Sequence, residues 1–393
     1  MARSGHAVGV VAEQRDRGPL LAMRTALFIL GAVFVALTAA GVLFVLVLPR
    51  RPRGLERLTL VVIAIVRLTF VALSRTARTF ESKDSMLSPT GPVCLVVQLL
   101  SWALGFILGF GLMMYATTHN FAQALLQATT SLFTVGAIHS GGRANIALDI
   151  GAGATWVVVV TLQIAYLPSL YTAFNRRESL VAMLESRSGV PAWGPEILAR
   201  HQIVGIADTL PDLYAAWEEW SADLAESHTT YPVLLFFRSP EAWYSWLIGL
   251  LAVLDAAAMH LALAPESASS QARLCLRMGF TALNRIALTL GWKVESDPNP
   301  AGPIVLRFDE FAEAVAMLED NGFKTERSAY DAWPDFVGWR VNYETVAYRL
   351  ADLTEAPPAP WSGLRRHIRL QTESPHRPPQ RTPRGFSHGG KND

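Results

Sequence analysis

Charged residues are scarce in this chain. They make up 17% of its 393 residues, whereas soluble proteins contain about 25%. The net charge of +1 predicts no nucleic-acid partner and no acidic partner. Apolar residues reach 51%, yet a mean hydropathy of +0.26 is too low for a chain that lies wholly in a membrane. Together these values predict a membrane part joined to a soluble part.

Cysteine is nearly absent, and common catalytic motifs are missing. The two cysteines, Cys94 and Cys275, lie in different regions, so the sequence predicts neither a disulfide framework nor a zinc site. It contains no Gly-x-Ser-x-Gly turn, no phosphate-cradling glycine loop and no dinucleotide fingerprint. Asp255 and His260 lack a third catalytic member. We therefore expect no enzyme activity, no cofactor and no metal centre.

Long apolar runs are what the sequence has in place of these motifs. Three of them are long enough to cross a bilayer, which takes about 20 apolar residues: 25–48, 92–116 and 147–174. Residues 1–24 are polar and are interpreted as irregular. The first run is too long for the apolar core of a signal peptide, so we predict a retained transmembrane helix.

A shorter apolar stretch, 58–73, carries Arg67 near its centre and allows two interpretations. It is either a short second span or a helix that lies along the membrane surface. Eight basic residues between 49 and 91 indicate a cytoplasmic segment, because cytoplasmic loops are rich in Lys and Arg. A crossing would place several of these arginines outside, so we favour the surface helix. The surface helix, however, places an N-terminus with four arginines outside the cell, against the same preference of basic residues for the cytoplasm. The two-span version therefore stays open.

A polar dip, 121–142, separates the second and third runs and has the sequence FAQALLQATTSLFTVGAIHSGG. Residues 121–133 can form about three helical turns. Non-helical backbone at membrane depth is tolerated where it lines a water-filled cavity, so the dip predicts a re-entrant pore loop. The short helix points the negative end of its dipole at the pore axis, and the extended residues after it turn oxygens towards a cation.

Residues 127–136 resemble the end of the pore helix and the first half of the filter in the potassium channel superfamily, Thr-Val-Gly-Tyr-Gly-Asp. The similarity covers 92–175, and the whole layout looks like that of bacterial ion-channel membrane proteins. It implies four subunits around one axis and a monovalent cation, potassium, as the partner. The pore residues that it implies are Thr129, Thr130, Thr134, Val135, Gly136 and Ala137.

The chain departs from that family pattern after Gly136. Where the family has Tyr-Gly-Asp, this chain has Ala137, Ile138 and His139. Alanine lacks the aromatic ring that braces the filter, and a β-branched isoleucine does not readily take the positive φ of a glycine. Strict potassium selectivity therefore does not follow. A non-conducting membrane scaffold or sensor derived from a channel fold stays open as the alternative.

The run 147–174 is predicted to be the inner helix of the pore. Pro168 lies two turns from its end, and a proline inside a helix removes a hydrogen bond and kinks it. The kink is either the gate or a simple bend towards the soluble part. Thr161, Gln163 and Tyr166 are the polar members of this helix and are predicted to face water, although Tyr166 also fits an interfacial belt.

The second half of the chain, 176–355, is predicted to be a cytoplasmic helical domain. Within it, 242–264 is apolar enough for a further span, but no basic cluster supports that topology, so we predict a buried core helix. Residues 356–393 are rich in Pro, Arg and His and are predicted to be a disordered basic tail. The predicted fold is thus an all-α protein of the cell membrane: an N-terminal transmembrane helix, a two-helix pore module with a re-entrant loop, and a cytoplasmic helical domain.

Overall fold

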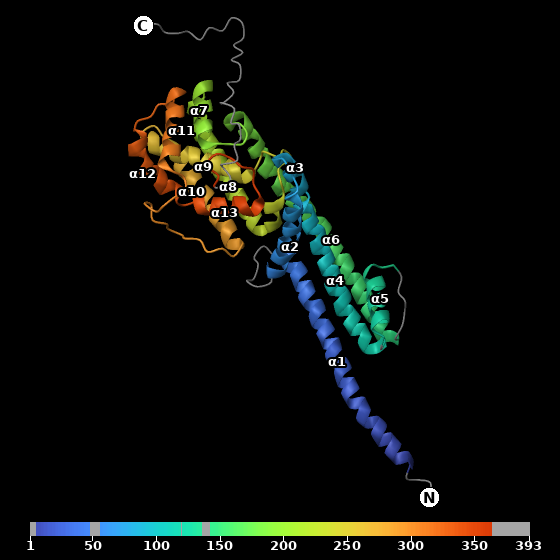
Figure 1. The fold of residues 1–393 in the computed structure, drawn as a ribbon. Helices are drawn as coiled ribbons and strands as arrows, with labels where there is room; N and C mark the ends of the chain where they lie inside the picture. The colour runs from blue at the N-terminus through green and yellow to red at the C-terminus, as the bar shows by residue number, and fades with distance from the viewer. Residues whose placement is uncertain (1–4, 48–55, 119, 136–141, 364–393) are drawn as a thin grey trace, which may run out of the picture. The chain divides into compact units, whose positions relative to one another are not determined.

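The computed structural model describes residues 5–47, 56–118, 120–135 and 142–363. Over these ranges the protein is helical without any strand, which confirms the all-α prediction (Figure 1). The chain divides into two compact units. Unit 1 holds residues 1–176 and 226–238, and unit 2 holds 177–225 and 239–393.

Unit 1 is built mainly from membrane-length helices. Within the described ranges, four helical stretches are long and apolar enough to cross a membrane, and three of them begin in unit 1: Ala22–Leu46, Phe80–Thr118 and Asn145–Ser188. The helices of unit 1 are α1 (Gly5–Leu46), α2 (Glu56–Ser74), α3 (Phe80–Leu87), α4 (Thr90–Thr118), α5 (Phe121–Leu132), most of α6 (Gly142–Ser188) and the 3₁₀ helix η2 (Pro232–Phe236).

Helix α1 is longer than predicted. It begins at Gly5, so the prediction that 1–24 is irregular is wrong for the described part of that segment. Residues 5–24 include several good helix formers (Ala, Leu, Met, Gln, Glu and Arg), and an established apolar helix extends readily into such a stretch. The predicted helix 92–116 is confirmed, because α4 differs from it by two residues at each end.

Helix α4 is the centre of unit 1. Trp102, Phe106 and Met114 on this helix are almost fully buried. α1 packs closely along α4 at paired glycines: a Cβ atom added to Gly31 would lie 2.5 Å from the carbonyl oxygen of Gly109. Small residues of this kind let two apolar helices approach each other in a membrane.

Helix α2 covers the predicted stretch 58–73 and packs on α3 and α4. It buries Val62, Ile63 and Val66, while its opposite side exposes Val61, Ile65 and Leu68. Both sides are therefore apolar. The distribution of apolar side chains on α2 does not distinguish a short span from a helix that lies on the membrane surface, so both predictions remain open.

The segment 226–238 belongs to unit 1, although it lies within the predicted domain 176–355. Arg238 forms an ion pair with Asp84 of α3. Next to it, Phe237 packs against the backbone of α4, where a Cβ atom added to Gly91 would lie 2.4 Å from the phenylalanine ring. An apolar segment ending in a paired arginine thus covers the start of α4.

Helix α6 extends beyond the predicted run 147–174 at both ends and continues through Pro168. The polar side chains of this helix do not all face outwards. Thr161 is exposed, but Gln163 and Tyr166 are 8% and 7% exposed and lie inside unit 1. The prediction that all three face water is wrong for these two within the single chain, because they line an internal pocket.

Unit 2 is organised around α9 (Trp246–Leu263), all of whose residues are buried. This confirms the prediction of a buried core helix at 242–264. Around α9 lie α7 (Gly194–Val204), α10 (Ser270–Thr289), α12 (Ala329–Arg340) and α13 (Glu344–Thr354). The remaining elements of the unit are η1 (Ala207–Thr209), most of α8 (Leu210–Thr230) and α11 (Phe308–Asp320).

The start of the predicted disordered tail is ordered. Ala356, Ala359 and Trp361 are buried in unit 2 at 4% exposure or less. The prediction of disorder from 356 onwards is therefore wrong for 356–363, because Trp361 brings a large apolar surface into a region that is otherwise rich in proline. Residues 364–393 lie outside the described residues.

Candidate functional site

The candidate site of unit 1 is built on the short helix α5. Its start is capped by Asn120, whose side-chain oxygen accepts a hydrogen bond from the backbone N–H of Gln123 at 3.2 Å. Ala124, Ala128 and Leu132, each four residues apart, are fully buried in the core that α5 shares with α4. This confirms the helix predicted at 121–133.

An adjacent side of α5 contributes Gln127 and Ser131 to a buried polar group, which they form with Asp149 of α6 and which we call the Asp149 cluster. The amide nitrogen of Gln127 donates to both carboxylate oxygens of Asp149, at 3.1 and 3.0 Å. The hydroxyl of Ser131 donates to Asp149 at 2.7 Å. All three side chains are 7% exposed or less. The cluster therefore fixes α5 to α6 through a desolvated carboxylate.

Sequence reasoning did not single out this cluster. A signal was nevertheless present, because Asp149 is an acidic residue near the start of the apolar run 147–174. An ionisable residue in such a run is expensive to bury and is usually functional. Its partners Gln127 and Ser131 lie one helical turn apart on α5, which is the spacing that lets two side chains share one acceptor.

Two further contacts hold the same region together. The hydroxyl of Thr117, at the end of α4, donates to the side-chain oxygen of Asn145 on α6 at 2.5 Å. Further along α6, a Cβ atom added to Gly153 would lie 3.3 Å from the carbonyl oxygen of Ser131. α6 thus approaches the end of α5 at a glycine, where no side chain intervenes.

Four of the six predicted pore residues lie within the described residues and come together at the end of α5. The hydroxyls of Thr129 and Thr130 donate to backbone carbonyls one turn earlier, at 2.8 and 3.0 Å. Their protons are therefore directed into the helix, and the oxygen lone pairs remain available as acceptors. Thr134 and Val135 follow and are exposed. Gly136 and Ala137 lie outside the described residues.

Helix α5 ends in a Schellman motif rather than in extended backbone. The N–H of Val135 donates to the carbonyl of Thr130 at 3.1 Å, and that of Thr134 to Ser131 at 3.2 Å. Thr134 has a φ of +56°, in the left-handed region. The prediction that extended residues follow the helix is therefore wrong at Thr134. A β-branched residue in this region is strained, and such strain is concentrated at functional sites.

Unit 2 contains a second buried polar group, centred on Arg340 of α12. Its guanidinium donates to Asp255 of α9 at 2.5 Å and to Glu344 of α13 at 3.0 Å. It also donates to the hydroxyl of Tyr348 at 2.9 Å and to the backbone oxygen of Trp361 at 2.7 Å. Arg340 is 0% exposed. One side chain thus joins three helices to the segment after α13.

The two carboxylates around Arg340 have further donors. The hydroxyl of Tyr343 donates to Asp255 at 2.7 Å, and the backbone N–H of Leu306 donates to Glu344 at 3.1 Å. Burial, together with the neighbouring Asp255, holds the pKa of Tyr343 well above its usual value, so this hydroxyl remains a donor. The arrangement is a satisfied structural network.

Asp255 and His260 do not form a catalytic pair. Asp255 pairs with Arg340, whereas the Nδ1 atom of His260 lies 3.3 Å from the hydroxyl of Tyr214. In the described part of the chain, no group of three or more His, Cys, Asp and Glu residues is arranged to hold a metal ion.

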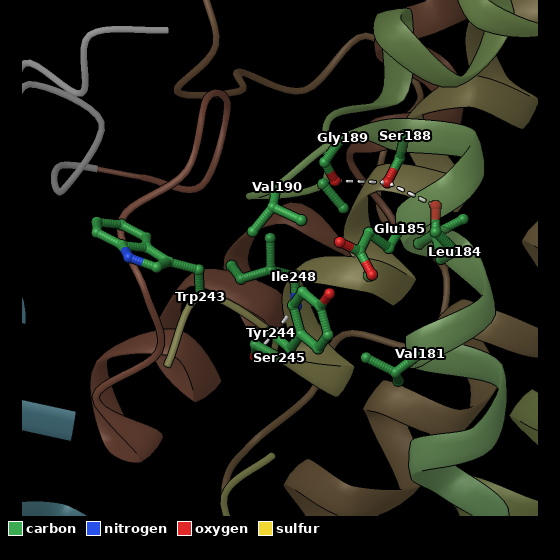
Figure 2. A pocket seen from close by; sticks show the side chains of 12 residues that line it. Val181, Leu184, Glu185, Ser188, Gly189, Val190, Trp243, Tyr244, Ser245 and Ile248 are labelled. Atoms are coloured by element: carbon green, nitrogen blue, oxygen red, sulfur yellow. Dashed lines mark hydrogen bonds between the residues drawn. The ribbon is translucent and has the colours of Figure 1, made fainter. Parts of the chain in front are cut away.

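Unit 2 also has a pocket beside the last turns of α6 (Figure 2). It encloses about 280 Å³ of empty space, part of it open to solvent. Burial, together with the neighbouring carboxylate of Glu185, raises the pKa of Tyr244 to about 12. Figure 2 shows these two groups close together, with Val181, Leu184 and Ile248 around them. A carboxylate within apolar walls suits a small ligand that carries a positive charge or hydrogen-bond donors.

Substitution Thr134→Gly is expected to stabilise unit 1. Left-handed backbone costs an L-residue about 1–2 kcal/mol, and glycine does not have this cost. We expect the free energy of unfolding to rise by about 1 kcal/mol. Thermal unfolding in detergent, followed by circular dichroism, measures it. A lower unfolding temperature for Thr134→Gly would show that Thr134 does not adopt positive φ.

Substitution Arg340→Met is expected to destabilise unit 2 strongly. It keeps an unbranched apolar side chain but leaves Asp255 and Glu344 buried without their cation, which costs about 3–5 kcal/mol. Chemical denaturation followed by tryptophan fluorescence measures the loss. The matched control is Arg277→Met on the exposed side of α10, which is expected to change stability by about 0.5 kcal/mol or less. Equal effects of the two substitutions would contradict the role of Arg340.

Comparisons with known proteins identify no relative: no protein-family model, no curated protein and no solved structure matches this chain.

Proposed function

We propose that this chain is one subunit of a membrane channel that conducts monovalent cations. In this proposal α4, α5 and α6 form the pore module, and four copies of it surround a common axis, as the resemblance to the potassium channel superfamily implies. One short helix per chain cannot enclose an axis, so a ring of identical subunits is needed. The exposed apolar residues of α6, among them Ile150, Val157 and Ile164, are available for contact with lipid or with neighbouring copies.

The observation that carries the proposal is the short length of α5 together with its attachment to α6 through the Asp149 cluster. Its 12 residues span about 18 Å at about 1.5 Å per residue. The hydrocarbon core of a bilayer is about 30 Å thick. A helix of this length between two membrane-length helices ends before it has crossed. The Asp149 cluster holds that end to α6, and exposed backbone at such a depth requires a water-filled cavity.

The chemistry at the end of α5 favours a cation. The C-terminal end of a helix carries partial negative charge. Thr129 and Thr130 add hydroxyl oxygens whose protons are already donated to backbone carbonyls. Oxygen atoms of this kind replace the water around a cation in channel filters. Potassium as the permeant ion rests on the resemblance at 127–136.

In this proposal unit 2 is a cytoplasmic domain that controls the pore. α6 is continuous from the pore module to Ser188, and its last turns line the pocket that contains Glu185 and Tyr244. A ligand bound there contacts the same helix that carries Pro168. A change in the helix near Pro168, the proposed gate, then opens or closes the pore.

A second candidate function is a non-conducting membrane scaffold or sensor. The observation that favours it is the inward position of Gln163 and Tyr166, which leaves α6 with a largely apolar exposed face. An apolar face suits contact between protein surfaces or with lipid better than it suits a water-filled vestibule.

Potassium efflux from proteoliposomes tests the channel. The wild-type protein is expected to release potassium faster than protein-free liposomes do. Thr134→Val keeps the shape of the side chain but removes its oxygen, and it is expected to reduce efflux about tenfold, the effect of about 1.4 kcal/mol. Thr69→Val, on the exposed side of α2, is the matched control and should leave efflux unchanged. Wild-type efflux equal to that of protein-free liposomes would overturn the channel proposal.

Cysteine accessibility separates the two functions. Thr161→Cys places a thiol on the exposed side of α6 in a chain whose native cysteines, Cys94 and Cys275, are both buried. A channel predicts that an aqueous thiol reagent modifies this cysteine in proteoliposomes. A scaffold predicts that it is protected, while Leu274→Cys, at an exposed position of α10, still reacts.

A further inference from the structure

Unit 1 contains a pocket of its own, which we call the Gln98 pocket. It contains about 400 Å³ of empty space, part of it open to solvent. Its walls come from α1, α2, α4, α6 and η2, and most of them are apolar: Val45, Ile63, Leu95, Trp102 and Val233. Among the described residues, no charged side chain lines it.

One polar atom in this pocket lacks a partner. Gln98 is 6% exposed, and its side-chain oxygen Oε1 is buried without any hydrogen bond. The orientation of the amide follows from its neighbour Ser101. The Ser101 hydroxyl donates its only proton to the backbone oxygen of Gln98 at 2.7 Å, so it must accept from the Gln98 nitrogen Nε2 at 3.2 Å. Oε1 is therefore the atom that needs a donor.

The pocket itself does not supply that donor. Gln163 and Tyr166 line the same space, yet neither forms a hydrogen bond with Oε1 of Gln98. Buried acceptors in folded proteins are almost always paired with protein, water or ligand.

We propose that the Gln98 pocket binds an amphiphile from the bilayer that has an apolar body and a single hydroxyl group. The hydroxyl donates to Oε1 of Gln98, and the apolar body lies against Trp102, Leu95 and the other apolar walls. The described part of the lining offers no charged side chain to pair with a charged head group, which favours a neutral one. The bilayer is the source, because α1 and α4, which form much of the wall, are long and apolar enough to lie in it.

Trp102 makes the site observable, since bromine quenches tryptophan fluorescence on contact and this side chain lines the pocket. The probes are 8-bromooctan-1-ol and 1-bromooctane, which share an apolar chain and differ in the hydroxyl. Each is titrated into the full chain in detergent micelles and expressed as mole fraction in the micelle. The alcohol is expected to quench at about a tenfold lower mole fraction, the effect of one added hydrogen bond. Because the chain contains ten other tryptophans, the quenching at this site is the difference between the wild-type protein and Trp102→Phe, and the preference for the alcohol should be absent from Trp102→Phe.

The variant Gln98→Leu is expected to bind both probes equally. Gln98→Met, an unbranched side chain of similar length, gives the same comparison if the leucine variant does not fold. Gln123→Leu, at an exposed position of α5, is the matched control and should keep the preference for the alcohol. Equal quenching by both probes in the wild-type protein overturns the proposal, as does a preference that survives at Gln98→Met. Absence of quenching by either probe, as expected if a water molecule alone occupies the site, overturns it as well.

Discussion

The arrangement of unit 1 depends on the attachment of a helix that is too short to cross a bilayer. The backbone groups at the ends of such a helix have no partners within the helix and must be satisfied by other means. Asn120 satisfies the first end, and the Schellman motif at Thr134 satisfies the second. Asp149 then fixes the direction of α5, because its carboxylate accepts hydrogen bonds from two consecutive turns of that helix.

Both units use a buried carboxylate to set the position of helices that have few other polar features. In unit 1, Asp149 is held by an amide and a hydroxyl, whereas in unit 2 Asp255 is held by a guanidinium and a phenol. Apolar contacts pack helices together but tolerate rotation and sliding. A directional hydrogen bond in an apolar surrounding does not tolerate these motions, since a misplaced partner leaves a buried polar group without a hydrogen bond.

The sequence predicted the features that depend on composition alone. The extents of α4 and α5 and the burial of α9 follow from runs of apolar residues and from the absence of nearby basic clusters. The burial of Gln163 and Tyr166 could not be predicted in this way. The sequence of α6 is largely apolar on every side, so it does not indicate which side is buried. Asp149 bonds to residues of α5, and the backbone of Trp361 bonds to Arg340. Both contacts join residues that are far apart in the chain, so no local sequence pattern could predict them.

The buried helix α9 has a consequence for synthesis. Its 18 residues have a mean hydropathy of 1.9, which is the kind of segment that the insertion machinery transfers into a membrane. Asp255 lies near its middle, where an aspartate opposes insertion by about 2.5–3.5 kcal/mol. After the unit has folded, Arg340 neutralises the same carboxylate. The acidic residue that opposes insertion of α9 into lipid is thus the same residue that Arg340 holds in the core of the folded unit.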